Sequence, residues 1–291
     1  MNTLKIFILI VILITIGVVV FIINYTKQPL PEIQPIKLPV EEKISAPEEG
    51  KEPEAIKVGV TLISVYDNYQ VNPELKTAWG FGSIVKTEKE NILFDTGGNS
   101  EILLFNMGKL DISPKSIDKV VISHIHGDHL GGLEGFLKEN NEVLVFIPSS
   151  FPDSIRNMIK NYGADFIDVS EPIKISESVW STGELYGPPE EQSLVIVSIN
   201  GLIVITGCGH PGVVKITKFA KKMFPEEEVY LVMGGFHHPP LSVVKELREL
   251  GVIKVAPSHC TGEPAREKFR KEYKEDFIEY GVGKIIKIKE K

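Results

Sequence analysis

The chain has 291 residues, enough for one large domain or two of ordinary size. Acidic residues outnumber basic ones, 39 to 32, and the net charge of −7 argues against a nucleic-acid-binding protein, for which a basic stripe is expected. The two cysteines, Cys208 and Cys260, each lie close to a histidine in the sequence. A role in a site is therefore at least as good an interpretation as a shared disulfide.

An uncharged apolar run, Ile6 to Ile23, lies near the N-terminus. At about 1.5 Å per residue, a helix of these 18 residues would span about 27 Å, close to the hydrocarbon core of a bilayer. The run lacks the small-residue cleavage site of a signal peptide. We therefore expect an uncleaved transmembrane anchor at residues 1–27, rather than a cleaved signal or a buried core helix. Lysines on both flanks leave the orientation open. We expect the commoner arrangement, in which residues 6–23 contact the membrane and the domain lies on the extracytoplasmic side.

Residues 28–56 have the composition of a linker, with six prolines, seven glutamates and three lysines. Such a stretch cannot bury enough apolar surface to fold, so we expect it to be disordered and extended. It carries −4 of the net charge of −7. The acidity of the chain is thus largely that of a solvated tether, which would hold the domain away from the membrane surface.

The remaining residues, 57–291, have the patterns of one globular domain. In its first half, short apolar runs with strand spacing are followed by stretches of helical spacing. We expect Ser100 to cap one helix and Pro152 to lie in the first turn of another. The expected strands are 58–65, 83–87, 91–94, 120–122, 143–147 and 166–169, and the expected helices are 100–109, 133–137 and 152–161.

The second half repeats this order. It begins with a hairpin that turns at Asn200-Gly201, and strands and helices then alternate. The expected strands are 193–197, 202–205, 229–233, 252–256 and 284–288, and the expected helices are 213–224, 242–250 and 263–273. Two sheet-bearing halves packed together with helices outside make a four-layered αββα sandwich, an α/β fold.

Every histidine of the chain lies just after a predicted strand. The stretch from Ser123 to Gly132 has three of them and one aspartate directly after a buried strand, and the other four follow later strands. Imidazole and carboxylate groups are the ligands that zinc and similar metals accept, and loops at strand ends commonly hold functional groups. The seven histidines are His124, His126, His129, His210, His237, His238 and His259.

The motif His124-x-His126-x-Asp128-His129 resembles that of the metallo-β-lactamase superfamily, and Asp95-Thr96-Gly97 is similar to the early aspartate of that superfamily. The likeness extends over the whole domain from about residue 57. Several further stretches are similar to a branch that includes a methanopterin-pathway synthase, which joins a dihydropterin to ribofuranosylaminobenzene phosphate. They are Gly80–Ser83, Thr206–His210, Gly234–His237 and His259–Gly262. The resemblance implies an αββα sandwich with a metal pair in the cleft between the halves.

The resemblance also implies which residues bind the two divalent metals. One metal would be held by His124, His126 and His210, and the other by Asp128, His129 and His259, with Cys208 as an additional candidate ligand. The chain departs from the common pattern in two respects. The usual Pro-Gly-His-Thr histidine is absent, and Cys208 stands where a bridging aspartate is usual. The mixed ligands suit zinc best, with manganese or iron as alternatives.

A metal pair of this kind would activate water, so we expect a membrane-tethered metal-dependent hydrolase of an ester, lactone, amide or phosphodiester. Asp128 would orient the water, His237 would contact the substrate or leaving group, and Asp95 would be a structural residue near the site. Backbone N–H groups of Thr261 and Gly262, at the start of a predicted helix, would bind an anion, which fits a small and anionic substrate. Two loops, 66–77 and 181–192, would line the cleft. The alternatives are a transferase with a diphosphate leaving group, like the synthase, and a non-enzymatic metal-binding module.

Overall fold

The computed structural model describes residues 56–289. The anchor expected at residues 6–23 and the linker expected at 28–56, except for its last residue, lie outside the described residues. Within residues 56–289, no helix is both long and apolar enough to cross a membrane.

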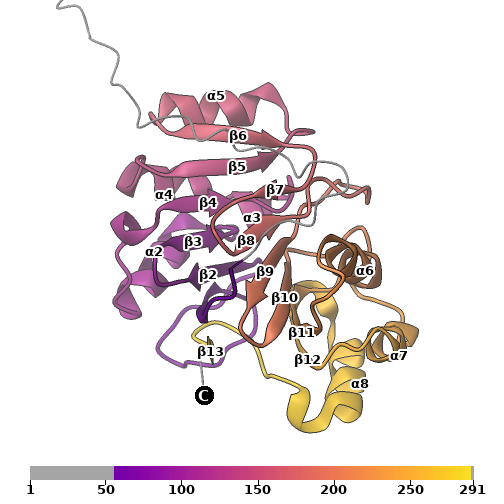
Figure 1. Cartoon of the computed structure of the whole chain (residues 1–291). Helices are drawn as coiled ribbons and strands as arrows, with labels where there is room; N and C mark the ends of the chain where they lie inside the picture. The colour runs from indigo at the N-terminus through magenta and orange to yellow at the C-terminus, as the bar shows by residue number, and fades with distance from the viewer. Residues whose placement is uncertain (1–55, 290–291) are drawn as a thin grey trace, which may run out of the picture. The chain divides into compact units, whose positions relative to one another are not determined.

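The first sheet has seven strands in the order β13-β1-β2-β3-β4-β5-β6 (Figure 1). Neighbours are antiparallel from β13 to β3 and parallel from β3 to β6. The strands are β1 (Val60–Tyr66), β2 (Gly82–Lys86), β3 (Asn91–Phe94), β4 (Lys119–Val121), β5 (Leu144–Pro148), β6 (Asp165–Val169) and β13 (Ile285–Ile288).

The second sheet has six strands in the order β12-β11-β10-β9-β8-β7. Strands β10, β11 and β12 run parallel, whereas β7 to β10 form antiparallel pairs. The strands are β7 (Ile173–Lys174), β8 (Val179–Ser181), β9 (Leu194–Ser198), β10 (Gly201–Thr206), β11 (Val229–Gly235) and β12 (Lys254–Ser258).

Helices cover the outer face of each sheet (Figure 1). They begin and end as follows: α2 (Ser100–Lys109), α3 (Gly127–Leu130), α4 (Leu133–Glu139), α5 (Asp153–Asn161), α6 (Val213–Met223), α7 (Ser242–Glu249) and α8 (Glu263–Tyr273). Helices α2, α4 and α5 share a core with the first sheet, and α6, α7 and α8 share one with the second.

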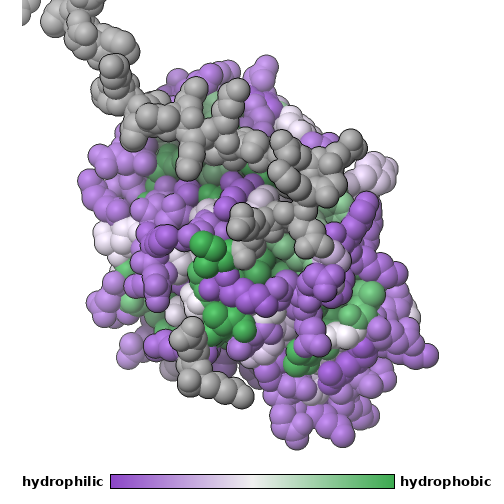
Figure 2. All heavy atoms as spheres, in the orientation of Figure 1, coloured by the Kyte–Doolittle hydropathy of each residue, from purple (hydrophilic) through white to green (hydrophobic). Residues whose placement is uncertain are grey.

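A third core lies between the two sheets and joins side chains of both, including Phe94 and Phe146 from the first and Ile196 and Ile205 from the second. Burial of this apolar surface is the main attraction that holds the halves together. Three cores between four layers confirm the predicted αββα sandwich. The described surface in Figure 2 is predominantly hydrophilic, with hydrophobic side chains in small patches.

Three local predictions need correction. The side chain of Asn99, not Ser100, caps α2, because its Oδ1 accepts the backbone N–H of Ile102. Pro152 is itself the N-cap of α5 and not a residue of its first turn. The last strand, β13, does not stay with the second half: it pairs with β1 at the edge of the first sheet.

Candidate metal centre

Four candidate metal ligands lie in the connection that leads from β4 into α3. After β4 the chain bends at Ile125 and is extended at His126, which is the N-cap of α3. His124 and His126 lie on either side of the bend, with ring nitrogens 3.1 Å apart. Asp128 and His129 follow in the first turn of α3. All four side chains thus come from one connection between a strand and a helix.

The first group of candidate ligands combines His124 and His126 from this connection with His210 from the loop after β10. The Nε2 atom of His124 lies 3.1 Å from Nδ1 of His126. The ring of His210 lies 4.7 Å from that of His124 and 4.9 Å from that of His126, measured between centroids. One nitrogen of each residue lies within 4.8 Å of the other two. This is the trio predicted for one metal.

The second group is centred on His129. Its Nε2 atom lies 3.2 Å from Nε2 of His259, 3.2 Å from Sγ of Cys208 and 3.6 Å from Oδ2 of Asp128. The Asp128 oxygen is also 3.3 Å from His259 Nε2. Asp128, His129 and His259, with Cys208 as an additional candidate, are the ligands predicted for the other metal.

The donor atoms fit a bound metal ion. Ligand nitrogens at about 2.0–2.1 Å from a tetrahedral zinc lie about 3.3 Å from each other, close to the 3.1 and 3.2 Å found within the two groups. Buried Nε2 of His210 has no hydrogen-bond partner among the described residues. A buried polar atom without a partner is costly, and a metal would satisfy it. Ligation and the identity of the metal remain predictions.

The protonation states of three of the histidines also suit metal binding. Burial, followed by the charge of neighbouring histidines, lowers the pKa of His124 well below its usual value and lowers that of His210 to about 4. Burial lowers the pKa of His259 as well. Neutral imidazole is the form that binds metals. Burial alone would raise the pKa of Asp128, but its hydrogen bond to His259 and the charge of His129 hold it well below the usual range.

Asp95, at the end of β3, orients ligand candidates of both groups. Its Oδ2 atom accepts from Nδ1 of His129 at 2.7 Å and from Oγ of Ser123 at 2.7 Å. The only hydroxyl hydrogen of Ser123 is used in that bond, so its oxygen accepts from Nδ1 of His124 at 2.8 Å. In the neutral form of each histidine, the Nε2 lone pair is therefore free for a metal. Burial opposes a charge on His129, but Asp95 outweighs it, and the net effect is a raised pKa.

Two further groups add sulfur to the centre. Cys208 lies with His124 and His129 in one and with His237 and Cys260 in the other, with ligand atoms within 4.8 Å of one another, and both cysteines are free and buried. The backbone N–H of His237 donates to Sγ of Cys260 at 3.3 Å. A hydrogen bond with Cys260, followed by burial, raises the pKa of Cys208, so its thiol is protonated at neutral pH in the metal-free protein. A site-related position thus describes both cysteines better than a disulfide.

His237 lies at the exposed edge of the first group. Its ring centroid is 4.2 Å from that of His210, and burial, followed by the charge of His238, lowers its pKa. Its backbone has a φ of +48°, in the left-handed region that bulky residues rarely adopt. Such residues cluster at functional sites, and His259 of the second group also has a positive φ, +47°. His238 belongs to none of the ligand groups in residues 56–289.

The predicted anion site is largely committed to internal contacts. The Thr261 hydroxyl donates to the carbonyl of Ser258 at 2.7 Å and accepts from the backbone N–H of Phe236 at 3.1 Å. A side chain at Gly262 would overlap the ring of His238. Anion binding by Thr261 and Gly262 therefore remains a prediction that rests on their backbone N–H groups alone.

The structure adds functional candidates that the sequence did not indicate. Oδ1 of Asn68 accepts from Nδ1 of His259 at 3.0 Å. The indole of Trp79 lies 4.8 Å from the His259 ring and is 56% exposed. Glu191 is fully buried beside the loop after β10. Asn68 and Glu191 lie in the two loops predicted to line the cleft, but neither has a sequence pattern that separates it from other polar residues.

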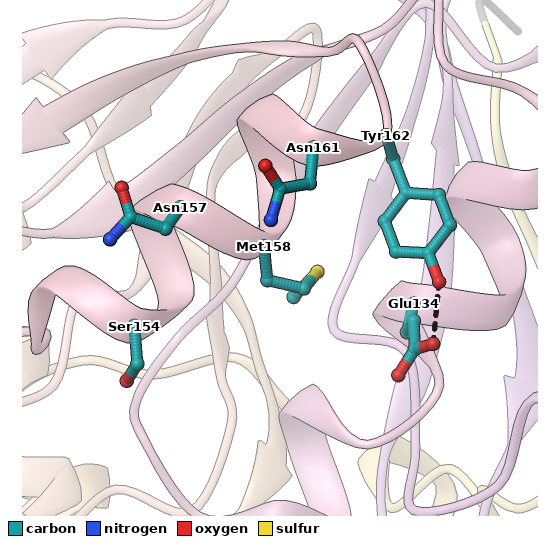
Figure 3. A pocket seen from close by; sticks show the side chains of 6 residues that line it. All are labelled: Glu134, Ser154, Asn157, Met158, Asn161 and Tyr162. Carbon is teal, nitrogen blue, oxygen red and sulfur yellow. Dashed lines mark hydrogen bonds between the residues drawn. The ribbon is translucent and has the colours of Figure 1, made fainter.

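A depression on the outer helices is distinct from this centre (Figure 3). It lies over α4 and α5, where the Tyr162 hydroxyl donates to Oε1 of Glu134 at 2.6 Å. None of its lining residues belongs to a ligand group. They are Glu134, Ser154, Asn157, Met158, Asn161 and Tyr162.

The sequence profile of the metallo-beta-lactamase superfamily matches residues 81–253, more than half of the chain. The chain therefore belongs to this superfamily and is an enzyme of it. It is also similar to the 7,8-dihydropterin-6-methyl-4-(beta-D-ribofuranosyl)-aminobenzene-5'-phosphate synthase of Methanocaldococcus jannaschii. The two are 34% identical over 78% of this chain and 95% of that protein. Ribonuclease Z of Nanoarchaeum equitans is also 34% identical, but over only 34% of this chain and 31% of its own length.

Solved structures agree on the fold. The crystal structure of Tm1679, a metal-dependent hydrolase of the beta-lactamase superfamily, matches with a TM-score of 0.67 and 26% identity, over 79% of this chain and all of that one. The metallo-beta-lactamase fold protein YhfI of Bacillus subtilis has a TM-score of 0.58 at 14% identity, over 79% of this chain and all of that one. Membership of the superfamily and likeness to the synthase confirm the resemblance predicted from the sequence.

Proposed function

We propose that this enzyme is a metal-dependent hydrolase of a phosphorylated small molecule. The observation that carries the proposal is the pair of convergent ligand groups, His124–His126–His210 and Asp128–His129–His259. Bound there, divalent metals would lower the pKa of a water toward about 7 and polarise an oxygen of the substrate. Likeness to Tm1679, a metal-dependent hydrolase, supports the reaction type. Likeness to a synthase whose name includes a 5'-phosphate supports the substrate class.

Two side chains of the centre have properties suited to proton transfer. The carboxylate of Asp128 is partly exposed and holds its negative charge, so it can accept a hydrogen bond from a water and orient it. His237 is exposed and has a lowered pKa, so its ring is neutral at pH 7. A neutral imidazole beside the first group can accept a proton or, once protonated, donate one to a leaving group.

The rim of the centre offers an apolar surface for a ring. Trp79 is held in place by its neighbours, since the Ala78 N–H donates to Asp67 and the Phe81 N–H donates to Asp128, both to backbone carbonyls at 3.3 Å. Trp79 is 56% exposed, and its ring lies 4.8 Å from that of His259. It supports a substrate with a planar ring, which would stack on the indole.

The second candidate is a transferase like the synthase, which the 34% identity over 95% of that protein favours. In the hydrolase, water would attack phosphorus, the P–O bond to the ester group would break, and the alcohol would leave with a proton. In the transferase, the C–O bond to a diphosphate would break, a second substrate would bond to the carbon, and diphosphate would leave. The two candidates therefore differ in the acceptor and share the metal centre.

We also propose that residues 6–23 anchor the enzyme in a membrane, with the domain on the extracytoplasmic side. The proposal rests on the uncharged 18-residue run. Protease treatment of intact cells tests it, with a cytoplasmic protein as control. Digestion of the domain is expected, and protection in intact cells combined with digestion after lysis would contradict the orientation.

The experiment for the main proposal begins with elemental analysis of the purified protein, the variant His126→Ala and the matched control His238→Ala. The parent and control are expected to hold divalent metal, and His126→Ala is expected to hold less. Hydrolysis of phosphodiester, phosphomonoester and lactone substrates is then measured. Release of product without any second substrate supports the hydrolase, and release only when an aromatic amine is added supports the transferase. Absence of metal from the active parent would rule out both.

A further inference from the structure

The buried side chain of Glu191 accepts hydrogen bonds from four consecutive backbone N–H groups of the loop after β10. Oε1 of Glu191 accepts from Gly207, Cys208 and Gly209 at 3.0, 3.1 and 2.9 Å, and Oε2 accepts from His210 at 2.8 Å. The side chain has no exposed surface and makes no ion pair with a lysine or arginine among residues 56–289. A concave run of N–H groups is a general anion-binding arrangement. In this protein the group bound there is a carboxyl group of the chain itself, whose pKa burial raises and the backbone hydrogen bonds of Gly209 and His210 lower in part.

The loop that Glu191 binds, residues 207–210, contains two of the candidate ligands, Cys208 and His210. It follows β10 with little freedom: Gly209 has a φ of +73°, and a side chain at Gly207 would overlap Ser123. No hydrogen bond is found for the buried Nε2 atom of His210 in the described part of the chain. Its position therefore depends on its backbone, and the backbone N–H of His210 is bound by Glu191.

The next residue, Gln192, makes the corresponding contacts with the first sheet. Its backbone N–H donates to the carbonyl of Ser123 at 2.9 Å, and its Nε2 donates to the carbonyl of Ile122 at 2.9 Å. Those two carbonyls lie directly before His124. The dipeptide Glu191–Gln192 therefore connects the backbone that presents His124 to the backbone that presents His210. These histidines come from opposite halves of the sandwich and must meet at one point.

We infer that Glu191 is a positioning residue of the metal centre, whose carboxylate holds the loop with Cys208 and His210 at the distance from His124 that a shared metal requires. The inference rests on the metal binding proposed above, but not on whether water or a second substrate is the acceptor. Groups that hold metal ligands in place typically account for about 10–100-fold in metal affinity.

The test compares Glu191→Gln and Glu191→Ala with the control Glu184→Gln. Glutamine keeps the shape of the side chain but turns an amide N–H₂ toward one of the four N–H groups, so at least one hydrogen bond is replaced by a repulsive contact. Glu184 lies on the same loop and also accepts a backbone N–H, that of Ser150 at 2.7 Å, but makes no hydrogen bond with residues 207–210 among those described. All variants should retain the circular dichroism of the parent.

Metal affinity is measured by competition with a chelator, and ligand geometry by the visible spectrum of the cobalt-substituted protein. Affinity is expected to fall about 10–100-fold in both Glu191 variants, with altered cobalt bands, and to stay unchanged in Glu184→Gln. Amide exchange of residues 207–210 in the metal-free protein is a second readout, which should accelerate in both Glu191 variants. Unchanged affinity, spectrum and exchange in a folded Glu191→Gln would overturn the inference. A parent that binds no metal would instead overturn the proposed function, and accelerated exchange alone would then identify Glu191 as merely structural.

Discussion

The two ligand groups differ in how firmly their rings are held. In the second group, Asp95 binds His129 directly and Asn68 binds His259, and both rings are buried. In the first group only His124 has such a partner, through Ser123. The rings of His126 and His210 make no hydrogen bond to a carboxylate or amide within residues 56–289. A preorganised site loses less freedom when it binds its ion. We therefore expect the second group to bind its metal more tightly and the first to exchange its metal more readily.

The largest effects on metal binding are expected when one histidine is removed from either group. His259→Ala is expected to abolish tight metal binding and to reduce kcat/KM about 10³-fold or more. His210→Ala should remove mainly the weaker metal and leave one tightly bound. Titration with metal, followed by elemental analysis, separates the two. Equal losses from both sites in each variant would contradict the difference between the groups.

The shared position of Asp95 predicts a smaller but wider effect. Asp95→Asn should weaken binding at the second group about 10–100-fold, because His129 loses its charged partner. The first group should weaken less, because the contact with His124 is indirect. Ser123→Ala is the matched variant, which should affect the first group alone. Chelator competition measures both, and a larger effect of Ser123→Ala on the second group would refute the assignment.

Cys208 and Cys260 offer a sharper test of the ligand set at the second group. If the Cys208 thiolate binds the metal beside His129, Cys208→Ser should lower metal affinity about 10-fold and remove the sulfur-to-cobalt absorption of the cobalt form. Cys260→Ser should retain that absorption. Loss of the band only in Cys260→Ser would reassign the sulfur ligand.

Trp79 should have the smallest effect, and one confined to binding. Trp79→Ala is expected to raise KM about 3–10-fold for substrates with a planar ring and to change kcat less than about twofold. Trp79→Phe should restore most of the affinity, since it keeps an aromatic face. Steady-state kinetics with matched aromatic and aliphatic esters measure the difference, and an equal change in KM for both esters would remove the stacking role.

Sequence reasoning succeeded where the information is local. The spacing of His124, His126, Asp128 and His129 is compact, and the order of strands and helices follows from periodicity that each segment contains by itself. His210 and His259 are distant in sequence and were assigned through the family resemblance, whereas a distant partner without a motif, Glu191, was missed. Nothing in the segment around Glu191 indicates that the loop after β10 folds against it, because that contact arises only when the sheets pack.

The same limit applies to the edges of the elements. Asn99 and Ser100 are both good cap residues, so the choice between them depends on the backbone geometry at the entrance to α2. The pairing of β13 with β1 is also invisible in the pattern of either strand, since a strand's composition does not specify its neighbour.

That pairing has a consequence for how the protein is made. Strand β13 is the last described element, and it pairs with β1, the first, through contacts such as Val60 with Ile288. A nascent chain leaving the ribosome can form β1 to β6 early, but the edge of this sheet stays open until the C-terminal residues emerge. Contacts so far apart in sequence form slowly, and open edges invite association with other chains. Deletion of β13 should therefore lower the yield and solubility of newly made protein. It should have less effect on the catalytic rate of the molecules that do fold.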